Sequence, residues 1–101
     1  MSTRAVVMFK DDSGTYSVYK HCDGYPDGEY GMIRSIQNAK ELAWPLPRFE
    51  ADEFGAAFIA VNKHQPGDIR LTTGPEAHGD LEYIYTVTLK DGKLHIETQA
   101  V

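Results

Sequence analysis

The strongest constraint on the fold lies near the end of the chain, in the dipeptide Asp91-Gly92. Asp-Gly is typical of two-residue type I′ hairpin turns, and the residues on both sides alternate between apolar and polar. Two strands that leave such a turn have a fixed register, in which apolar positions meet on one face and mostly polar positions on the other. The apolar face pairs Leu89 with Leu94, Val87 with Ile96 and Tyr85 with Thr98; the other face pairs Thr88 with His95, Thr86 with Glu97 and Ile84 with Gln99.

The start of the chain predicts a second hairpin. Residues 4–10 are apolar on both faces, which is typical of a central or covered strand. Residues 11–14, Asp-Asp-Ser-Gly, form a turn cluster, and residues 15–21 alternate again as a strand does. We therefore expect two antiparallel strands before the middle of the chain.

Two helices are expected in the middle. Residues 29–44 place apolar side chains at helical spacing, and Pro45 ends that helix because proline has no amide hydrogen to donate. Residues 50–63 repeat the pattern, with acids at the start and bases at the end, as the helix dipole favours. Trp44 is expected to close the core where the helices meet. The expected buried stripes are Met32, Ile36, Ala39 and Ala43 in the first helix, and Phe54, Phe58 and Val61 in the second.

Together these segments predict an α+β fold. A short strand is expected over residues 69–73 and a polar loop over residues 74–80. The order is then β-β-α-α-β-β-β, an antiparallel sheet of about five strands with two helices packed on one face. The chain shows no repeat, linker or low-complexity segment, so we expect residues 1–101 to form a single α+β domain.

The net charge of −5 argues against direct nucleic-acid binding, which needs a basic face. The negative charge is concentrated between Asp23 and Glu53, where seven acids stand against three bases, and an acidic surface of this kind steers basic partners. No apolar run approaches the roughly 18 residues that span a membrane, and the N-terminus does not resemble a signal peptide. With one cysteine and no nucleotide-binding glycine motif, we expect a cytoplasmic protein without a cofactor.

Residues 21–28, His-Cys-Asp-Gly-Tyr-Pro-Asp-Gly, hold the densest group of reactive side chains. A catalytic Cys22 would need a lowered pKa and a base in reach, and a metal site centred on His21 and Asp23 would need ligand spacings that the loop does not have. A reversal of the chain from strand to helix accounts for the same residues: Pro26 presets a turn, and Asp27 can cap the helix that follows.

Two stretches carry a family resemblance. Residues 19–28, Y-K-H-C-D-G-Y-P-D-G, and residues 43–63, A-W-P-L-P-R-F-E-A-D-E-F-G-A-A-F-I-A-V-N-K, followed by the strand Gly67–Leu71, resemble a family of small uncharacterised proteins from bacteriophages, prophages and their bacterial hosts. Members often have a bulkier residue at the position of Cys22, which argues further against a catalytic cysteine. The resemblance implies a protein that acts inside a bacterium by binding a host factor.

The leading hypothesis is a small, acidic, non-enzymatic phage-type protein that binds and modulates a bacterial host protein with a basic surface, such as a defence or nucleic-acid-handling factor. Two alternatives stay open: a metal-binding protein or hydrolase-like enzyme centred on His21 and Asp23, and a structural homodimer. The residues expected to contact the partner are Asp23, Tyr25 and Asp27. Glu50, Asp52 and Glu53 are expected beside them if the two helix starts lie together in space.

Overall fold

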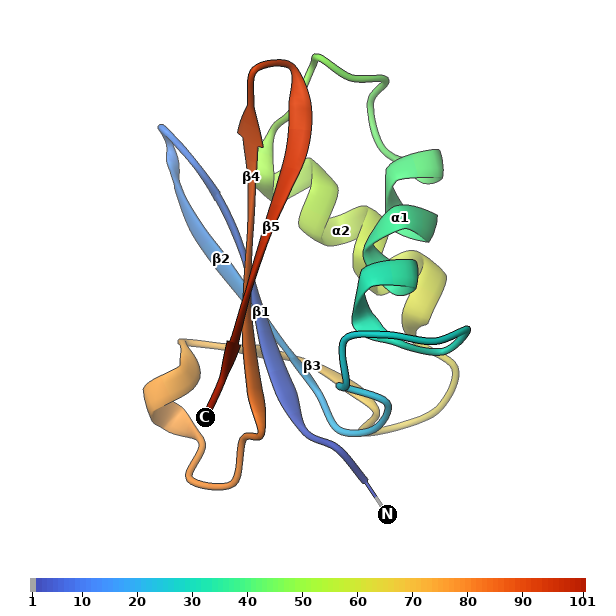
Figure 1. Ribbon diagram of the computed structural model, residues 1–101, viewed down its shortest axis with the longest axis vertical. Coiled ribbons are helices and arrows are strands. Elements are labelled where there is room, and N and C mark those ends of the chain that lie inside the picture. Colours follow the sequence, from blue (N-terminus) through green and yellow to red (C-terminus); the bar gives the residue numbers. More distant parts are fainter. Residues whose placement is uncertain (1) are drawn as a thin grey trace.

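Both predicted hairpins form, and the two helices lie together on one face of a single sheet (Figure 1). The computed structural model describes residues 2–101. The predicted order β-β-α-α-β-β-β is confirmed, with a short 3₁₀ helix added in the loop before the last hairpin. The elements are β1 (Ala5–Asp11), β2 (Gly14–Lys20), α1 (Met32–Leu42), α2 (Ala51–Asn62), β3 (Ile69–Thr72), η1 (Pro75–Ala77), β4 (Tyr83–Lys90) and β5 (Lys93–Ala100).

The strand order is β3-β2-β1-β4-β5, so β1 is central, as its two apolar faces indicate. One pair departs from the expected antiparallel sheet, because β1 and β4 run parallel. After α2 the chain forms β3 at the outer edge of β2, and residues 73–82 then carry it back across the sheet to β1. The strand that follows therefore enters from the same end as β1.

The register predicted for the last hairpin is confirmed at all six positions, from Leu89 opposite Leu94 to Ile84 opposite Gln99. Asp91 and Gly92 have φ values of 53° and 77°, the left-handed conformations that a type I′ turn requires.

The core lies between the sheet and the helices. Phe9 of β1 contacts the rings of Phe54 and Phe58 of α2 at centroid separations of 5.6 and 5.5 Å, and all three are buried. Gly55 faces the same ring, and a β-carbon there would lie 3.4 Å from Phe9. The absence of a side chain at Gly55 thus lets α2 pack closely on the centre of the sheet.

The opposite face of the sheet is partly covered by the loop that contains η1. His78 of this loop stacks on Tyr19 of β2, with the ring centroids 4.4 Å apart and the planes 9° from parallel. Tyr19 is 3% exposed, so a second small apolar layer lies on this side.

Two sequence expectations about the helices are wrong at their ends. α1 begins at Met32 rather than at residue 29, because the preceding loop residues supply carbonyl partners for its first amides. Trp44 does not close the core, since it lies beyond the end of α1 and is 42% exposed. In the part of the chain that the structure describes, neither helix has the length and apolar character needed to cross a membrane.

Candidate functional site

The loop between β2 and α1, residues 21–31, is held by the main chain. The amide of Gly24 donates to the carbonyl of Thr3 at 2.8 Å, and the buried hydroxyl of Tyr85 donates to the carbonyl of Gly24 at 2.5 Å. Burial raises the pKa of Tyr85, so the hydroxyl keeps its proton and remains a donor. The middle of the loop is thereby fixed to the centre of the sheet.

Glycine is required at position 24 because a side chain would not fit there, and not because of its backbone conformation. A β-carbon at Gly24 would lie 2.7 Å from both the Ala5 β-carbon and the Thr3 carbonyl oxygen. The left-handed positions of the loop are Asp23, with φ of 58°, and Gly28, with φ of 101°. Aspartate tolerates this conformation better than most residues do. Gly31 is also required because a side chain would not fit, since a β-carbon there would lie 2.5 Å from the carbonyl oxygen of Asp27.

The expectation that Asp27 caps the following helix is wrong. α1 has no side-chain cap, and its first amides instead donate to main-chain carbonyls of the loop. The amide of Met32 donates to Tyr25 at 2.8 Å, and that of Ile33 donates to Pro26 at 3.1 Å. The carboxylate of Asp27 is therefore left on the surface.

Five residues of this loop form what we call the acidic loop: Asp23, Tyr25, Asp27, Glu29 and Tyr30. Its three carboxylates are exposed, and none takes part in an ion pair within residues 2–101. Tyr25 is half-buried and Tyr30 is 67% exposed. The surface thus combines unpaired negative charge with aromatic rings on a fixed backbone.

A groove of about 540 Å³ runs beside the acidic loop, between the loop and the first turns of α1. Asp27 and Glu29 line it on one side, and Ile33 and Arg34 of α1 line it on the other. The groove offers a concave, mostly polar surface next to the exposed tyrosine.

Lys20, at the end of β2, is a charged residue that the sequence analysis missed. It is 9% exposed and lies on the helix-facing side of the sheet together with Val18. Burial lowers the pKa of Lys20, whereas the carboxylates of Asp23 and Asp68 act to raise it. Strand alternation from Val18 was the available signal for this burial. Asp23 therefore favours the charged form of Lys20, although the two side chains form no ion pair within residues 2–101.

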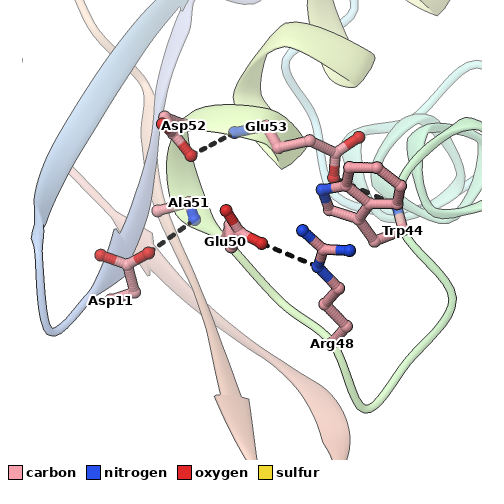
Figure 2. A network of polar contacts seen from close by, with 7 residues as sticks. All are labelled: Asp11, Trp44, Arg48, Glu50, Ala51, Asp52 and Glu53. Carbon is pink, nitrogen blue, oxygen red and sulfur yellow. Dashed lines mark hydrogen bonds and ion pairs between the residues drawn. The ribbon is translucent and has the colours of Figure 1, made fainter.

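The second group of predicted site residues, Glu50, Asp52 and Glu53, lies at the start of α2 (Figure 2); we call them the α2 acids. All three accept hydrogen bonds within the molecule. Glu50 accepts one from Arg48 Nε at 2.8 Å, Glu53 accepts one from the amide of Trp44 at 3.1 Å, and Asp52 accepts one from the amide of Glu53 at 2.7 Å.

The start of α2 is capped by a residue of the first hairpin, Asp11. Its Oδ2 accepts a hydrogen bond from the amide of Ala51 at 2.8 Å (Figure 2). Its Oδ1 accepts bonds from the amides of Ser13 and Gly14. The bond from Ala51, and after it that from Ser13, lowers the pKa of Asp11. Sequence analysis assigned Asp11 only to a turn, because this contact joins residues 40 positions apart.

The segment between the helices folds back on itself at Trp44. The guanidinium carbon of Arg48 lies 3.8 Å from the centroid of the Trp44 ring, a cation–π contact at the surface (Figure 2). Glu50 and Glu53 hold Arg48 and Trp44, so these two of the three α2 acids stabilise the corner between the helices.

The two acidic groups are not brought together. α1 and α2 pack side by side and run in opposite directions, so their starts lie at opposite ends of the helical layer (Figure 1). The condition under which all six predicted residues would form one surface is therefore not met. The acidic loop and the α2 acids are separate regions.

The alternative site at His21 and Asp23 finds little support in the geometry. His21 Nδ1 lies 2.9 Å from the hydroxyl of Tyr19, and no ion pair within residues 2–101 joins His21 to an acid. Cys22 is half-buried, with its Sγ 3.5 Å from Ser2 Oγ. Within residues 2–101, no three histidine, cysteine or acidic side chains lie together in a group that could hold a metal ion.

Comparisons of this chain with protein-family models, with curated proteins and with solved structures found no match.

Proposed function

We propose that this protein is a small binding protein that docks a basic region of a partner protein on its acidic loop. The observation that carries the proposal is that Asp23, Asp27 and Glu29 are exposed and form no ion pair within residues 2–101, on a backbone that main-chain contacts hold in place. Unpaired surface carboxylates increase the rate at which a basic partner associates.

Two further features of the acidic loop support binding. Tyrosine is enriched at protein interfaces, because it provides a large contact area and a polar hydroxyl at little cost in conformational entropy. Tyr30 is 67% exposed, and Tyr25 lies half-buried between the acids. Since Gly24 and Tyr85 fix the loop before any partner arrives, little ordering is lost on binding.

The α2 acids have no such role in this proposal, because they already accept hydrogen bonds within the molecule. A partner that bound Glu50 or Glu53 would compete with Arg48 or with the amide of Trp44 for the same carboxylate.

The resemblance to small phage and prophage proteins supports a partner inside a bacterium. A host factor that handles nucleic acid, including one that takes part in defence, would fit the charge, since nucleic-acid-binding proteins present basic surfaces. Binding would be stoichiometric, and the acidic loop would occupy the basic surface of the partner.

The test compares the proteins captured from a bacterial lysate by three forms of the chain. The first is the wild type, the second is the loop variant Asp23→Asn, Tyr25→Ala, Asp27→Asn, and the third is the matched control Asp52→Asn, Glu53→Gln. We expect the wild type and the control to retain the same partner and the loop variant to lose it. Raising the salt from about 0.05 to about 0.5 M should weaken the capture, because exposed charges are screened over this range.

The proposal is wrong if the folded loop variant retains the partner as well as the wild type does. It is equally wrong if the control variant alone loses the partner, because the contact would then lie at the start of α2. Circular dichroism and thermal unfolding of each variant establish that it is folded.

A further inference from the structure

The two edges of the sheet differ sharply. β3, at one edge, has four residues and is bounded by Gly67 and Gly74, both with positive φ. β5, at the other edge, has eight residues and contains neither proline nor glycine. Natural sheets usually shorten or interrupt an exposed edge, because its unpaired amides and carbonyls can pair with another strand.

The free groups of β5 follow from its hairpin with β4. In a two-residue hairpin the residues flanking the turn, here Lys90 and Lys93, exchange hydrogen bonds, and every second pair after them does the same. The odd-numbered residues of β5 therefore bond to β4, and the even-numbered residues turn their amides and carbonyls outward. Within residues 2–101 no other element bonds to this outer edge. The outward residues are Leu94, Ile96, Thr98 and Ala100.

We propose that the outer edge of β5 is a dimerisation surface that pairs antiparallel with β5 of a second copy, with Ile96 opposite itself on the two-fold axis. This pairing joins the two sheets into one, with five strands from each copy. It does not depend on the acidic loop, which lies on a different part of the molecule.

The register follows from charge and overlap. The two strands form hydrogen bonds only where outward residues of one copy lie opposite outward residues of the other. The alternative registers therefore differ from one another by steps of two residues. With Ile96 opposite Ile96, residues 93–99 overlap completely, and His95 of each copy faces Glu97 of the other. Shifting the register by one step in one direction would place Glu97 opposite Glu97. Shifting it by one step in the other direction would place His95 opposite His95 and shorten the overlap of the two strands. Like charges directly opposite each other destabilise a strand pair, which disfavours Glu97 opposite Glu97. An imidazole opposite a carboxylate can instead donate a hydrogen bond to it, which favours His95 opposite Glu97.

The side chains of β5 suit this arrangement on both faces of the sheet. In the single chain, His95 Nε2 already lies 3.5 Å from Glu97 Oε1 on the face away from the helices, and the dimer places a second carboxylate beside each imidazole. On the helix-facing side, Leu94 and Ile96 pack against the core but remain partly exposed. The pairing covers them with Thr98 and Ile96 of the second copy.

The first test uses Thr98→Pro with Thr98→Ala as its control. The amide of Thr98 points outward, so proline at this position removes a hydrogen bond of the dimer and leaves the ladder to β4 intact. Light scattering over about 1 µM to 1 mM protein should show the wild type and Thr98→Ala changing from monomer to dimer, while Thr98→Pro stays monomeric. A wild type that is monomeric at every concentration, or a dimer that Thr98→Pro leaves unchanged, overturns the proposal.

The second test fixes the register by cross-linking in a Cys22→Ser background. Ile96→Cys places two thiols opposite each other at about 5.5 Å between α-carbons, within disulfide range. Leu94→Cys is the control, because its two copies lie four residues apart along the strand, about 13 Å. We expect at least a tenfold faster intermolecular disulfide for Ile96→Cys than for Leu94→Cys. Equal rates would overturn the register, and this readout stands even if Thr98→Pro fails to fold.

Discussion

The two acidic regions look alike in the sequence but differ in what holds them. The acidic loop keeps its shape through main-chain contacts, with Gly24 fixed to Thr3 and to Tyr85. Its carboxylates form no ion pair within residues 2–101. The start of α2 is shaped by the carboxylates themselves. Acids that maintain the fold are poorly available for a partner, whereas acids on a backbone held by other contacts are available.

Among the variants that test this difference, Gly24→Ala is expected to lower the free energy of unfolding most. The added methyl group would meet Thr3 and Ala5 at 2.7 Å, and one of these contacts is with main chain that cannot move freely. Overpacking of this kind costs about 2–3 kcal/mol of the free energy of unfolding, which urea denaturation measures.

The matched control is Gly79→Ala, because nothing lies within 4 Å of a β-carbon at Gly79. Its free energy of unfolding should stay within about 0.5 kcal/mol of the wild type. If Gly24→Ala were equally mild, the main-chain contacts would not be what holds the acidic loop.

A smaller effect is expected from Asp11→Ala, which removes the cap of α2 contributed by the first hairpin. The loss of a helix cap should lower Tm by about 5 °C near neutral pH in a domain of this size. Asp12→Ala is the control, since Asp12 is exposed and accepts no hydrogen bond from another residue within residues 2–101.

The pH dependence of the Asp11→Ala effect has a definite sign. Because the amides of Ala51 and Ser13 hold the pKa of Asp11 below its ordinary value of 3.8, its carboxylate contributes stability fully above that pH. The contribution is lost as pH falls through the lower pKa of the folded state. The gap in Tm between wild type and Asp11→Ala should therefore be constant from about pH 5 to 7 and narrow below pH 3.8. A gap that does not narrow would contradict the role of the ionised carboxylate.

Sequence patterns predicted most of the fold, because its determinants are local. Asp91-Gly92 specified a hairpin together with its register, and the alternation of apolar residues identified β1 as central. The parallel pairing of β1 with β4 was missed, because it depends on where the crossover returns rather than on any residue near the strands.

The candidate site was predicted only in part, because some of its contacts join residues that are far apart in the sequence. Asp23, Asp27 and Tyr25 lie on one loop, so sequence proximity was enough to group them. The cap from Asp11 to Ala51 joins residues 40 positions apart, and the placement of Glu50 at the far end of the helical layer depends on the antiparallel packing of α1 and α2. Contacts of this kind are set by the tertiary fold, and no pattern within a short window encodes them.

The smallest expected difference compares two double variants of equal charge. Asp27→Asn, Glu29→Gln and Asp52→Asn, Glu53→Gln each remove one aspartate and one glutamate charge, so any effect of net charge cancels. Asp52 and Glu53 lie in the first turn of α2, where their negative charge interacts favourably with the positive end of the helix dipole. Glu53 also accepts a hydrogen bond from the amide of Trp44. Urea denaturation at low salt should show a loss of about 0.5–1 kcal/mol for the α2 pair and less than about 0.3 kcal/mol for the loop pair. Salt should reduce the first loss, because exposed charges are screened. Equal losses would mean that Asp27 and Glu29 also support the fold, and the distinction between the two acidic regions would then fail.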